Sequence, residues 1–406
     1  MKKISFIHAA DLHLDSPMVG LKHLPANIFT RVKESTFTAL KRLTAEAIHR
    51  NVDFVILAGD LFDGEDRSLM AQSRFRSEML KLAEMNIPVY VIHGNHDHLN
   101  GSWVQLGMPD NVHIFGSTVE KKVLQTKSGE NIHLYGFSYP VRHVYDKKIA
   151  DYQKVEDADF HIGILHGNVS GGEEHDNYAP FTIKELDEKQ FDYWALGHIH
   201  KRTIISEHPP IVYPGNIQGR NKKEKDEKGF YHVTLSESEA ILNFVEASDI
   251  IWEEAFVDAS LASNFYEIVQ LCQFEMNRQR KEKTGTLLTL FLENVQLDDS
   301  REKRSLDGEL LELLLEDEKD EESFVWLVDL VISENVKVNK EQLKVEANFY
   351  AELFDTAESY DDITTVISPL YEHRLGRKFL STLSDTDQKE LIENAEKLLI
   401  KLLYQS

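Results

Sequence analysis

Cysteine is almost absent from the sequence, and so are long apolar stretches. The single cysteine among 406 residues, Cys272, excludes an internal disulfide and a zinc site built from several thiolates. No segment approaches the roughly 18 to 20 consecutive apolar residues that a membrane-spanning helix needs. The apolar stretch near the N-terminus reaches His8 and Asp11 too soon to be a signal peptide. We therefore expect a protein of the reducing cytoplasm with no membrane partner.

Basic residues are also few relative to acidic ones. Forty-five Lys and Arg residues against 69 Asp and Glu residues give a formal net charge of −24. Such a charge disfavours non-specific attraction to a phosphate backbone. A nucleic-acid substrate would therefore need bound metal ions, local basic patches or a partner protein to supply the attraction. In other respects the composition is that of a soluble globular chain, and the length suits two or three domains.

Strand-like and helix-like segments alternate over about the first 245 residues. Six near-continuous apolar runs are typical of strands buried on both faces: 4–8, 54–58, 89–93, 132–136, 161–165 and 193–196. Helical periodicity fills residues 28–50 and 69–85, and Thr182 is followed by Glu185 in the pattern of a capping box. This alternation predicts a layered α/β sandwich over residues 1–247.

The rest of the chain has a different pattern. Four segments alternate between helical and strand-like periodicity: 261–276, 286–292, 306–315 and 324–331. They predict a small α+β domain over residues 248–338, in which the acidic run 316–322 is a solvated loop. Residues 339–406 are predicted to form a helical C-terminal region.

Short polar clusters follow or end five of the predicted strands. They are Asp11-Leu12-His13, Gly59-Asp60-Leu61-Phe62-Asp63, Gly94-Asn95-His96-Asp97, His166-Gly167 and Gly197-His198-Ile199-His200. Because the carboxyl ends of strands in an open α/β sheet face the ligand crevice, clusters far apart in the sequence can converge there. Each cluster alone could be an ordinary turn, but five in succession, each behind an apolar strand, favour a functional site.

The donor types in these clusters are carboxylate, imidazole and amide oxygen, without thiolate. This combination suits borderline-hard divalent ions such as Mn²⁺ better than a structural zinc. The candidate ligands are too many for one ion and about right for two ions that share a carboxylate. Two ions about 3.5–4 Å apart can activate water and stabilise an in-line displacement at phosphorus.

On these signatures the sequence resembles the calcineurin-like metallophosphoesterases, and within them the SbcD-type DNA repair exonucleases, most of all their YhaO-like subgroup. The small α+β domain and the turn Tyr213-Pro214-Gly215-Asn216 favour this nuclease branch. Gly64-Glu65 and Asp97 also favour it, since the protein phosphatases usually have Arg-Gly and Glu there. The resemblance implies a four-layer α/β/β/α sandwich, then a small α+β capping domain and C-terminal helices.

The resemblance also implies a role for each residue of the site. One metal ion would be held by Asp11, His13, Asp60 and His200. The other would be held by Asp60, Asn95, His166 and His198, with Asp60 bridging the two. His96 matches the catalytic histidine that contacts the scissile phosphate and protonates the leaving oxygen, and Asp63 would fix its tautomer. These roles imply a phosphodiesterase with two divalent ions, Mn²⁺ by preference, acting as a DNA exonuclease or endonuclease subunit in DNA repair.

Two basic clusters stand out against the acidic background. Residues 220–225 contain four candidate DNA-binding residues: Arg220, Lys222, Lys223 and Lys225. The alternative for this cluster is a solvated hairpin tip. Residues 278–283 could also grip phosphates, or they could be the charged C-terminus of a helix, which favours cations.

The C-terminal segment is predicted to form an amphipathic helix. Ser384 and Asp387 have the spacing of a capping pair. One apolar face follows: Leu391, Ala395, Leu398, Leu399 and Leu402. Such a helix docks on its own domain or fills a partner's groove. The resemblance implies the second option, with an SbcC-like ATPase of the SMC type as the partner, and a homodimer formed through residues 69–85 and 103–106.

Two other functions use the same metal ligands. A small-molecule or nucleotide phosphoesterase of the same superfamily fits the ligands and is favoured by the net charge of −24. A non-catalytic scaffold would keep the fold without the chemistry. The additional C-terminal residues and the finer motif matches favour the nuclease, and the intact ligand set with His96 disfavours the scaffold.

Overall fold

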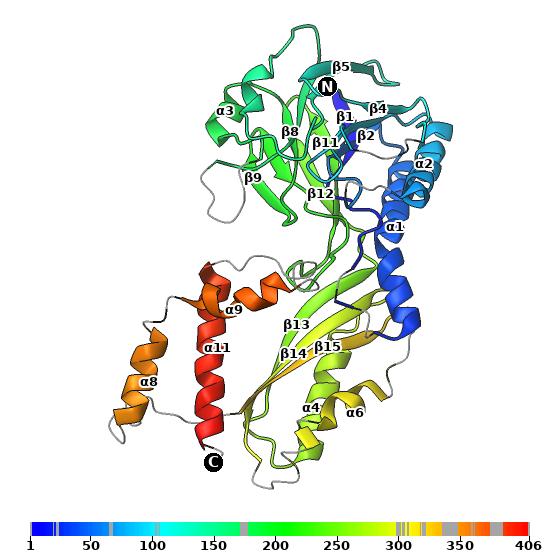
Figure 1. Cartoon of the computed structure of the whole chain (residues 1–406). Helices are drawn as coiled ribbons and strands as arrows, with labels where there is room; N and C mark the ends of the chain where they lie inside the picture. The colour runs from blue at the N-terminus through cyan, green and yellow to red at the C-terminus, as the bar shows by residue number, and fades with distance from the viewer. Residues whose placement is uncertain are drawn as a thin grey trace. The chain divides into compact units, whose positions relative to one another are not determined.

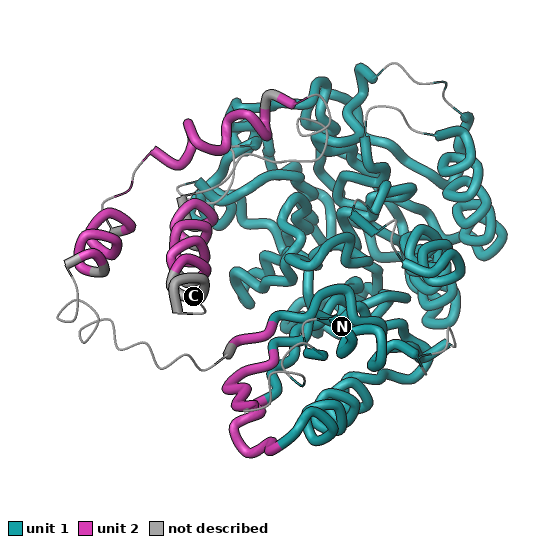
Figure 2. The backbone as a smooth tube through the Cα atoms, turned by 60° about the horizontal axis from the view of Figure 1, so that its bottom comes forward, with its two compact units in different colours: residues 1–257, 264–291, 299–331 teal, residues 258–263, 292–298, 332–406 magenta. Residues whose placement is uncertain are grey.

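The structure is a computed structural model of the whole chain (Figure 1). It describes residues 2–18, 20–21, 24–64, 68–101, 104, 106–170, 178–297, 302, 305–306, 308–316, 318, 322–334, 348–358, 360, 362–373 and 385–404. The chain divides into two compact units (Figure 2). The first comprises residues 1–257, 264–291 and 299–331, and the second comprises residues 258–263, 292–298 and 332–406.

A first six-stranded sheet contains the N-terminal strands, in the order β12-β11-β1-β2-β3-β4. Its strands are β1 (Lys3–Ala9), β2 (Phe54–Ala58), β3 (Val89–Ile92), β4 (Val112–Ile114), β11 (Gly229–Ser236) and β12 (Ala240–Glu246). Strands β1 to β4 run parallel, whereas β11 is antiparallel to both β1 and β12.

A second six-stranded sheet has the order β5-β6-β7-β8-β10-β9. Its strands are β5 (Glu120–Gln125), β6 (Asn131–Gly136), β7 (Phe160–His166), β8 (Tyr193–Gly197), β9 (Thr203–Glu207) and β10 (Pro210–Tyr213). Strands β6, β7, β8 and β10 run parallel, and the edge strands β5 and β9 are antiparallel to their neighbours.

The two sheets pack face to face, and helices cover their outer faces. Phe6 of the first sheet meets Tyr193 of the second edge-on, with ring centroids 5.2 Å apart, inside a shared core. Helices α1 (Ala26–His49) and α2 (Leu69–Glu84) cover the first sheet. The second sheet packs against α3 (Ile183–Asp187) and the 3₁₀ helix η1 (Lys148–Asp151). The predicted α/β/β/α order of layers is therefore confirmed.

The six predicted strands agree with β1, β2, β3, β6, β7 and β8 to within one residue at each end. The capping box at the start of α3 is also confirmed, because Thr182 accepts a hydrogen bond from Glu185 N while the Glu185 side chain accepts one from Thr182 N. The polar clusters follow or end these strands, so they lie where the carboxyl ends of the parallel strands meet.

A three-stranded sheet follows, with the order β13-β14-β15. Its strands are β13 (Ile250–Asp258), β14 (Gly285–Val295) and β15 (Val325–Glu334), and the helices of this segment are α4 (Phe265–Arg278) and α6 (Leu310–Glu316). Trp252 and Phe324 share an apolar cluster with Ile28 of α1. Asp249 forms ion pairs with Arg31 at 3.0 Å and Arg42 at 3.1 Å. Of the predicted acidic loop, residues 317 and 319–321 lie outside the described part of the chain.

Three helices make up most of what is described of the second unit: α8 (Asn348–Glu358), α9 (Ile363–Glu372) and α11 (Asp385–Tyr404). They line an apolar cavity of about 370 Å³, to which α11 contributes Leu391, Ala395 and Leu399. Ser384 lies outside the described residues, as does Trp103 of the predicted dimer contact. In the described ranges, no helix combines the length and apolar character needed to cross a membrane.

Candidate metal centre

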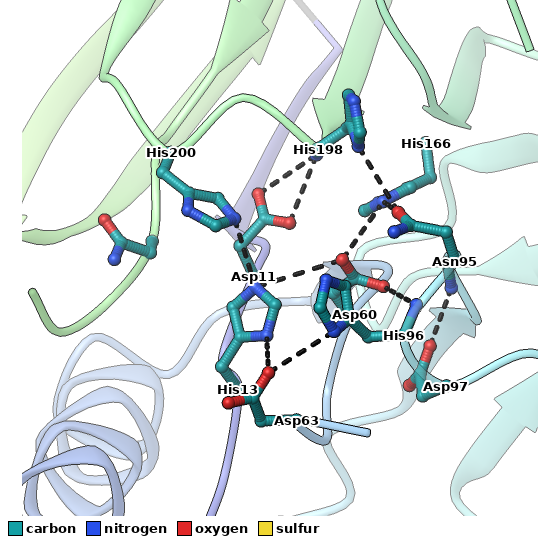
Figure 3. Close-up of polar contacts among 12 residues, drawn as sticks. Asp11, His13, Asp60, Asp63, Asn95, His96, Asp97, His166, His198 and His200 are labelled. Atoms are coloured by element: carbon teal, nitrogen blue, oxygen red, sulfur yellow. Dashed lines mark hydrogen bonds and ion pairs between the residues drawn. The ribbon is translucent and has the colours of Figure 1, made fainter. Parts of the chain in front are cut away.

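The predicted site residues lie at the carboxyl ends of five strands drawn from both sheets (Figure 3). Asp11 and His13 follow β1, Asp60 and Asp63 follow β2, Asn95 and His96 follow β3, His166 ends β7, and His198 and His200 follow β8. Close contacts link their side chains into one group, so the parallel strands bring together residues that are far apart in the sequence.

The loops that carry these residues have an unusual backbone. Four of the site residues have positive φ angles: Asp11 (52°), His13 (42°), Asp60 (50°) and His198 (101°). Such conformations cost a non-glycine residue on the order of 1–3 kcal/mol and persist only where the surroundings hold them. Hydrogen bonds from Asp11 N to Gly59 O and from His13 N to Asp60 O, both 3.0 Å, hold the loops after β1 and β2 together.

A glycine allows the loops to approach each other at the centre of the site. A Cβ atom added to Gly94 would lie 2.4 Å from Asp60 Oδ1 and 2.6 Å from His166 Nε2. No side chain fits at this position without displacing two of the candidate ligands. The space between the loops is therefore kept for polar ligand atoms.

Two imidazole rings face each other in the first donor group. The Nε2 atoms of His13 and His200 lie 3.1 Å apart. Asp11 completes this group, whose ligand atoms all lie within 4.8 Å of one another. On the far side of each ring stands a carboxylate: Glu224 Oε1 is 2.7 Å from Nδ1 of His200, and Asp63 Oδ1 is 3.3 Å from Nδ1 of His13.

These carboxylates determine where the ring protons lie. Burial disfavours an ionised Glu224, but His200 and Arg220 outweigh burial and hold the pKa of Glu224 well below its usual range. An ionised carboxylate only accepts hydrogen bonds, so Nδ1 of His200 must carry the proton, although Arg220 Nη2 also lies 3.2 Å from it. Burial and the nearby Arg220 lower the pKa of His13 to about 3, which keeps that ring neutral. With the ring proton on Nδ1 of each histidine, both Nε2 atoms are available to bind a cation.

The second group of candidate metal ligands contains His166, Asn95 and Asp60. Nδ1 of His166 donates to the carbonyl oxygen of Ala58 at 2.9 Å, so Nε2 is the ring atom that can bind an ion once it has lost its proton. This atom lies 3.1 Å from Asn95 Oδ1 and 3.4 Å from Asp60 Oδ2. Burial disfavours the imidazolium, but the charge of Asp60 outweighs burial and raises the pKa of His166 to about 9. The donor set therefore fits a divalent ion, whose charge would replace that proton.

Asp60 lies between the two donor groups. Its Oδ2 atom is 3.4 Å from His166 Nε2 and 3.9 Å from His13 Nε2, while its Oδ1 atom accepts a hydrogen bond from His96 N. Asp11 also belongs to both groups, and both of its oxygens accept from His198 N at 3.1–3.2 Å. Two carboxylates are therefore placed where each can contact a pair of ions.

His96 stands beside the ligands with its ring partly exposed. Asp63 Oδ1 lies 3.3 Å from Nδ1 of His96 and accepts a hydrogen bond from Arg220 Nη1 at 3.2 Å. Burial lowers the pKa of His96, but Asp63 outweighs burial and raises it above the ordinary value. The ring is thus well suited to hold a proton at neutral pH and release it to a substrate oxygen.

Glu224 contacts a proposed ligand but was not predicted as a site residue from the sequence. This carboxylate accepts hydrogen bonds from Arg220 N and Asn216 Nδ2, both 2.8 Å, in addition to its contact with His200. A lone acidic residue inside a basic run carries no local signal of such a role. Arg220 is largely buried against Asp63 and Glu224, while Lys222 is exposed and Lys225 forms an ion pair with Glu254.

Asp97 supports the site from below. Its carboxylate accepts hydrogen bonds from Leu61 N at 2.9 Å and Gly94 N at 2.7 Å, and His93 Nδ1 lies 2.9 Å away. The loop after β2 is thereby tied to the loop after β3. Asp97 thus connects two loops that carry proposed ligands.

A cavity of about 680 Å³ opens over the centre. Proposed ligands form part of its wall, together with His96. Four lysines also line it: Lys201, Lys223, Lys225 and Lys228. The cavity thus places four lysines, of which Lys225 pairs with Glu254, among the acidic residues Asp60, Glu224 and Asp226, and the lysines can attract an anionic substrate.

Comparisons with known proteins agree with this geometry. The family model of the calcineurin-like phosphoesterases matches residues 4–202, which include every strand-end cluster. The uncharacterized metallophosphoesterase YhaO of Bacillus subtilis is 42% identical over 403 residues, which are 98% of each chain. The DNA double-strand break repair protein Mre11 of Methanocaldococcus jannaschii is 27% identical over 63% of this chain and 69% of its own.

More remote likenesses add little. Mre11 of Thermoplasma acidophilum is 25% identical over 59% of this chain and 65% of its own. A dimetal phosphatase structure from Danio rerio aligns with a TM-score of 0.36 and 12% identity, over 60% of this chain and 96% of that one, a likeness too low to bear on this protein. The relative with 42% identity over nearly the whole chain decides the assignment. The chain belongs to the calcineurin-like metallophosphoesterase family.

Proposed function

We propose that this metallophosphoesterase is a two-metal phosphodiesterase that cleaves DNA. Membership of the family implies metal-dependent hydrolysis of a phosphoester. The observation that carries the proposal further is the position of the candidate ligand groups beside a cavity lined by four lysines. A strand with several phosphates can use both features at once, whereas a small phosphoester needs only the first.

The residues divide between two ions as follows. Asp11, His13, Asp60 and His200 would hold one ion, and Asp60, Asn95, His166 and His198 would hold the other. The position of Asp60 Oδ2 between His166 and His13 supports a bridging role for this residue. Carboxylate, imidazole and amide donors without thiolate favour Mn²⁺.

The mechanism relies on these side chains and on His96. When bound, the two ions would lower the pKa of an attacking water and neutralise charge on the phosphate. His96 lines the cavity and donates its proton to the leaving oxygen. Asp63 keeps the His96 ring oriented and its proton in place, and Arg220 in turn fixes Asp63. Glu224 keeps the Nε2 lone pair of His200 directed at the centre.

The choice of DNA rests on the cavity and on the relatives. Lys223 and Lys225, two of the predicted DNA-binding residues, line the cavity together with Lys201 and Lys228. The Mre11 proteins that resemble this chain are named for DNA double-strand break repair. We therefore place the activity in DNA repair in the cytoplasm.

Assembly with other chains belongs to the same proposal. The apolar cavity between α8, α9 and α11 supports docking of an SMC-type ATPase on the second unit. Leu69 and Met70 at the start of α2 have exposed side chains, which supports a homodimer contact in this region. Both contacts would enlarge the DNA-binding surface of an acidic chain.

One assay separates the three candidate functions. The purified chain with Mn²⁺ is incubated with a linear duplex, a single strand and bis-para-nitrophenyl phosphate, with the His96→Ala variant as the control for contaminating nucleases. We expect cleavage of DNA that the variant lacks. Hydrolysis of the small diester alone would identify a small-molecule phosphoesterase, and inactivity on all three substrates would identify a scaffold.

A further inference from the structure

An aromatic cluster adjoins the metal centre on the side of His198. We call His143, Tyr145 and Tyr178 the aromatic patch. The rings of His143 and Tyr145 are 5.8 Å apart and 12° from parallel, and those of His143 and Tyr178 are 5.6 Å apart and 23° from parallel. The Tyr178 ring lies 5.1 Å from the ring of His198. The patch therefore extends an aromatic surface outward from a proposed metal ligand.

The patch is held in place although much of it faces solvent. The hydroxyl of Tyr178 forms a hydrogen bond with His143 Nδ1 at 3.0 Å, and Ala179 N donates to the carbonyl oxygen of Val144 at 2.6 Å. Val144 and Ala179 are buried in the core beneath the second sheet. Tyr145, in contrast, is 63% exposed, and His143 is exposed as well. The buried neighbours Val144 and Ala179 thus hold the backbone that carries the rings, while the ring faces remain accessible to solvent.

We propose that the aromatic patch binds an unpaired nucleobase of the DNA strand whose phosphodiester reaches the metal centre. This rests on the proposed nuclease function and names its substrate more closely. Exposed aromatic faces recognise bases of any sequence by stacking. A strand presents phosphates and bases. The phosphates then meet the cavity lysines and a base meets the aromatic patch, because both the cavity and the patch border His198.

The inference also concerns the state of the DNA. A base inside a duplex is already stacked on both faces and cannot lie on Tyr145. Only a base from a single strand or a frayed end offers a free face. We therefore expect the enzyme to act on unpaired strands in preference to the interior of a duplex.

The test compares two oligomers of equal length in the full chain with Mn²⁺. One is oligothymidylate, and the other has the same phosphates with abasic sugars throughout. We expect wild-type kcat/KM to be at least about tenfold higher on oligothymidylate, which corresponds to ~1.4 kcal/mol. Tyr145→Ala should lower this ratio several-fold, and Tyr145→Phe should preserve it because the stacking face remains. Val141→Ala, an exposed residue of the same segment, serves as the matched control.

A second measurement separates binding from catalysis. The affinity of the metal-free proteins for both oligomers is measured by fluorescence anisotropy, and Tyr145→Ala should weaken only the binding of oligothymidylate. A wild-type enzyme that cleaves both oligomers equally would overturn the patch and leave the nuclease intact. Equal losses in Tyr145→Phe or in Val141→Ala would also overturn it. A chain that hydrolyses neither oligomer but does hydrolyse bis-para-nitrophenyl phosphate would overturn the nuclease itself.

Discussion

Glu224 acts on the metal centre from outside the proposed ligand set, and its replacement by Gln changes one atom. Oε2 of Glu224 accepts from Arg220 N and Asn216 Nδ2, whereas Oε1 accepts from Arg220 Nη2 at 3.2 Å and faces Nδ1 of His200 at 2.7 Å. Oε2 meets two fixed donors and Oε1 meets only one, the guanidinium of Arg220, while the His200 ring can move its proton. In Glu224→Gln the amide oxygen therefore takes the Oε2 position and the amide N–H₂ group faces His200.

The substitution changes the protonation of the His200 ring, a proposed metal ligand. An N–H donor opposite Nδ1 forces the His200 proton onto Nε2, the atom that lies 3.1 Å from His13 Nε2. Replacement of such a supporting carboxylate typically costs about 10–100-fold in metal affinity. We expect Mn²⁺ to bind Glu224→Gln more weakly by that factor, or ~1.4–2.7 kcal/mol.

The assay is titration of the metal-free proteins with Mn²⁺ in a calorimeter, with metal content after dialysis as a second reading. Glu254→Gln is the matched control, because Glu254 pairs with Lys225. Among the contacts that the described residues make, there is none between Glu254 and His200. Thermal unfolding of the metal-free variants shows whether the fold is intact. Wild-type Mn²⁺ affinity in a folded Glu224→Gln protein would refute the reasoning.

The other roles can be tested by similar means. His96→Ala should keep its Mn²⁺ and lose about 10²–10⁴-fold in turnover, while Asp60→Ala should lose metal; an empty site in His96→Ala would contradict this division. Because the pKa of His166 is raised to about 9 and a bound ion must displace that proton, Mn²⁺ affinity should rise between about pH 7 and 9, and an affinity independent of pH in calorimetry would contradict it. Joint replacement of Lys222, Lys223 and Lys225 by Gln should flatten the salt dependence of DNA binding, and an unchanged slope would remove them from the interface. Deletion of residues 384–406 should spare hydrolysis of bis-para-nitrophenyl phosphate and abolish capture of the ATPase, and retained capture would place the partner elsewhere.

The strands that the sequence predicts well are those with continuous apolar runs. β2 and β7 are buried along their whole length, and most of their residues are therefore apolar. β5 and β9 are edge strands with partly exposed side chains, and β5 contains Lys121 and Lys122. Such strands owe their place to pairing with β6 and β10, and no local pattern of burial marks them. β13 was not predicted either, since the predicted α+β domain began with a helix.

The same contrast holds for the site. Asp11, Asn95 and His166 could be grouped from the sequence because a general rule places the ends of parallel strands at a common edge. No such rule covers the irregular segment between β10 and β11, where Arg220 and Glu224 reach the site through tertiary contacts alone. Its basic composition was compatible with contact to phosphate or with a solvated hairpin tip. In the structure, Arg220 forms ion pairs with Asp63 and Glu224.

The net charge of −24 and a DNA substrate are compatible only if the attraction is local. Charges separated by more than about 8 Å are largely screened at physiological ionic strength, so a bound strand responds to the cavity wall and not to the whole surface. Asp60 lines that cavity, and Asp11 and Asp63 belong to the adjoining ligand groups; these carboxylates would repel a phosphate if nothing neutralised them. The proposed ions supply that neutralisation at the point of cleavage, and the lysines supply it along the flanking phosphates. On the proposed function, removal of the ions should therefore weaken attachment of the substrate as well as its hydrolysis.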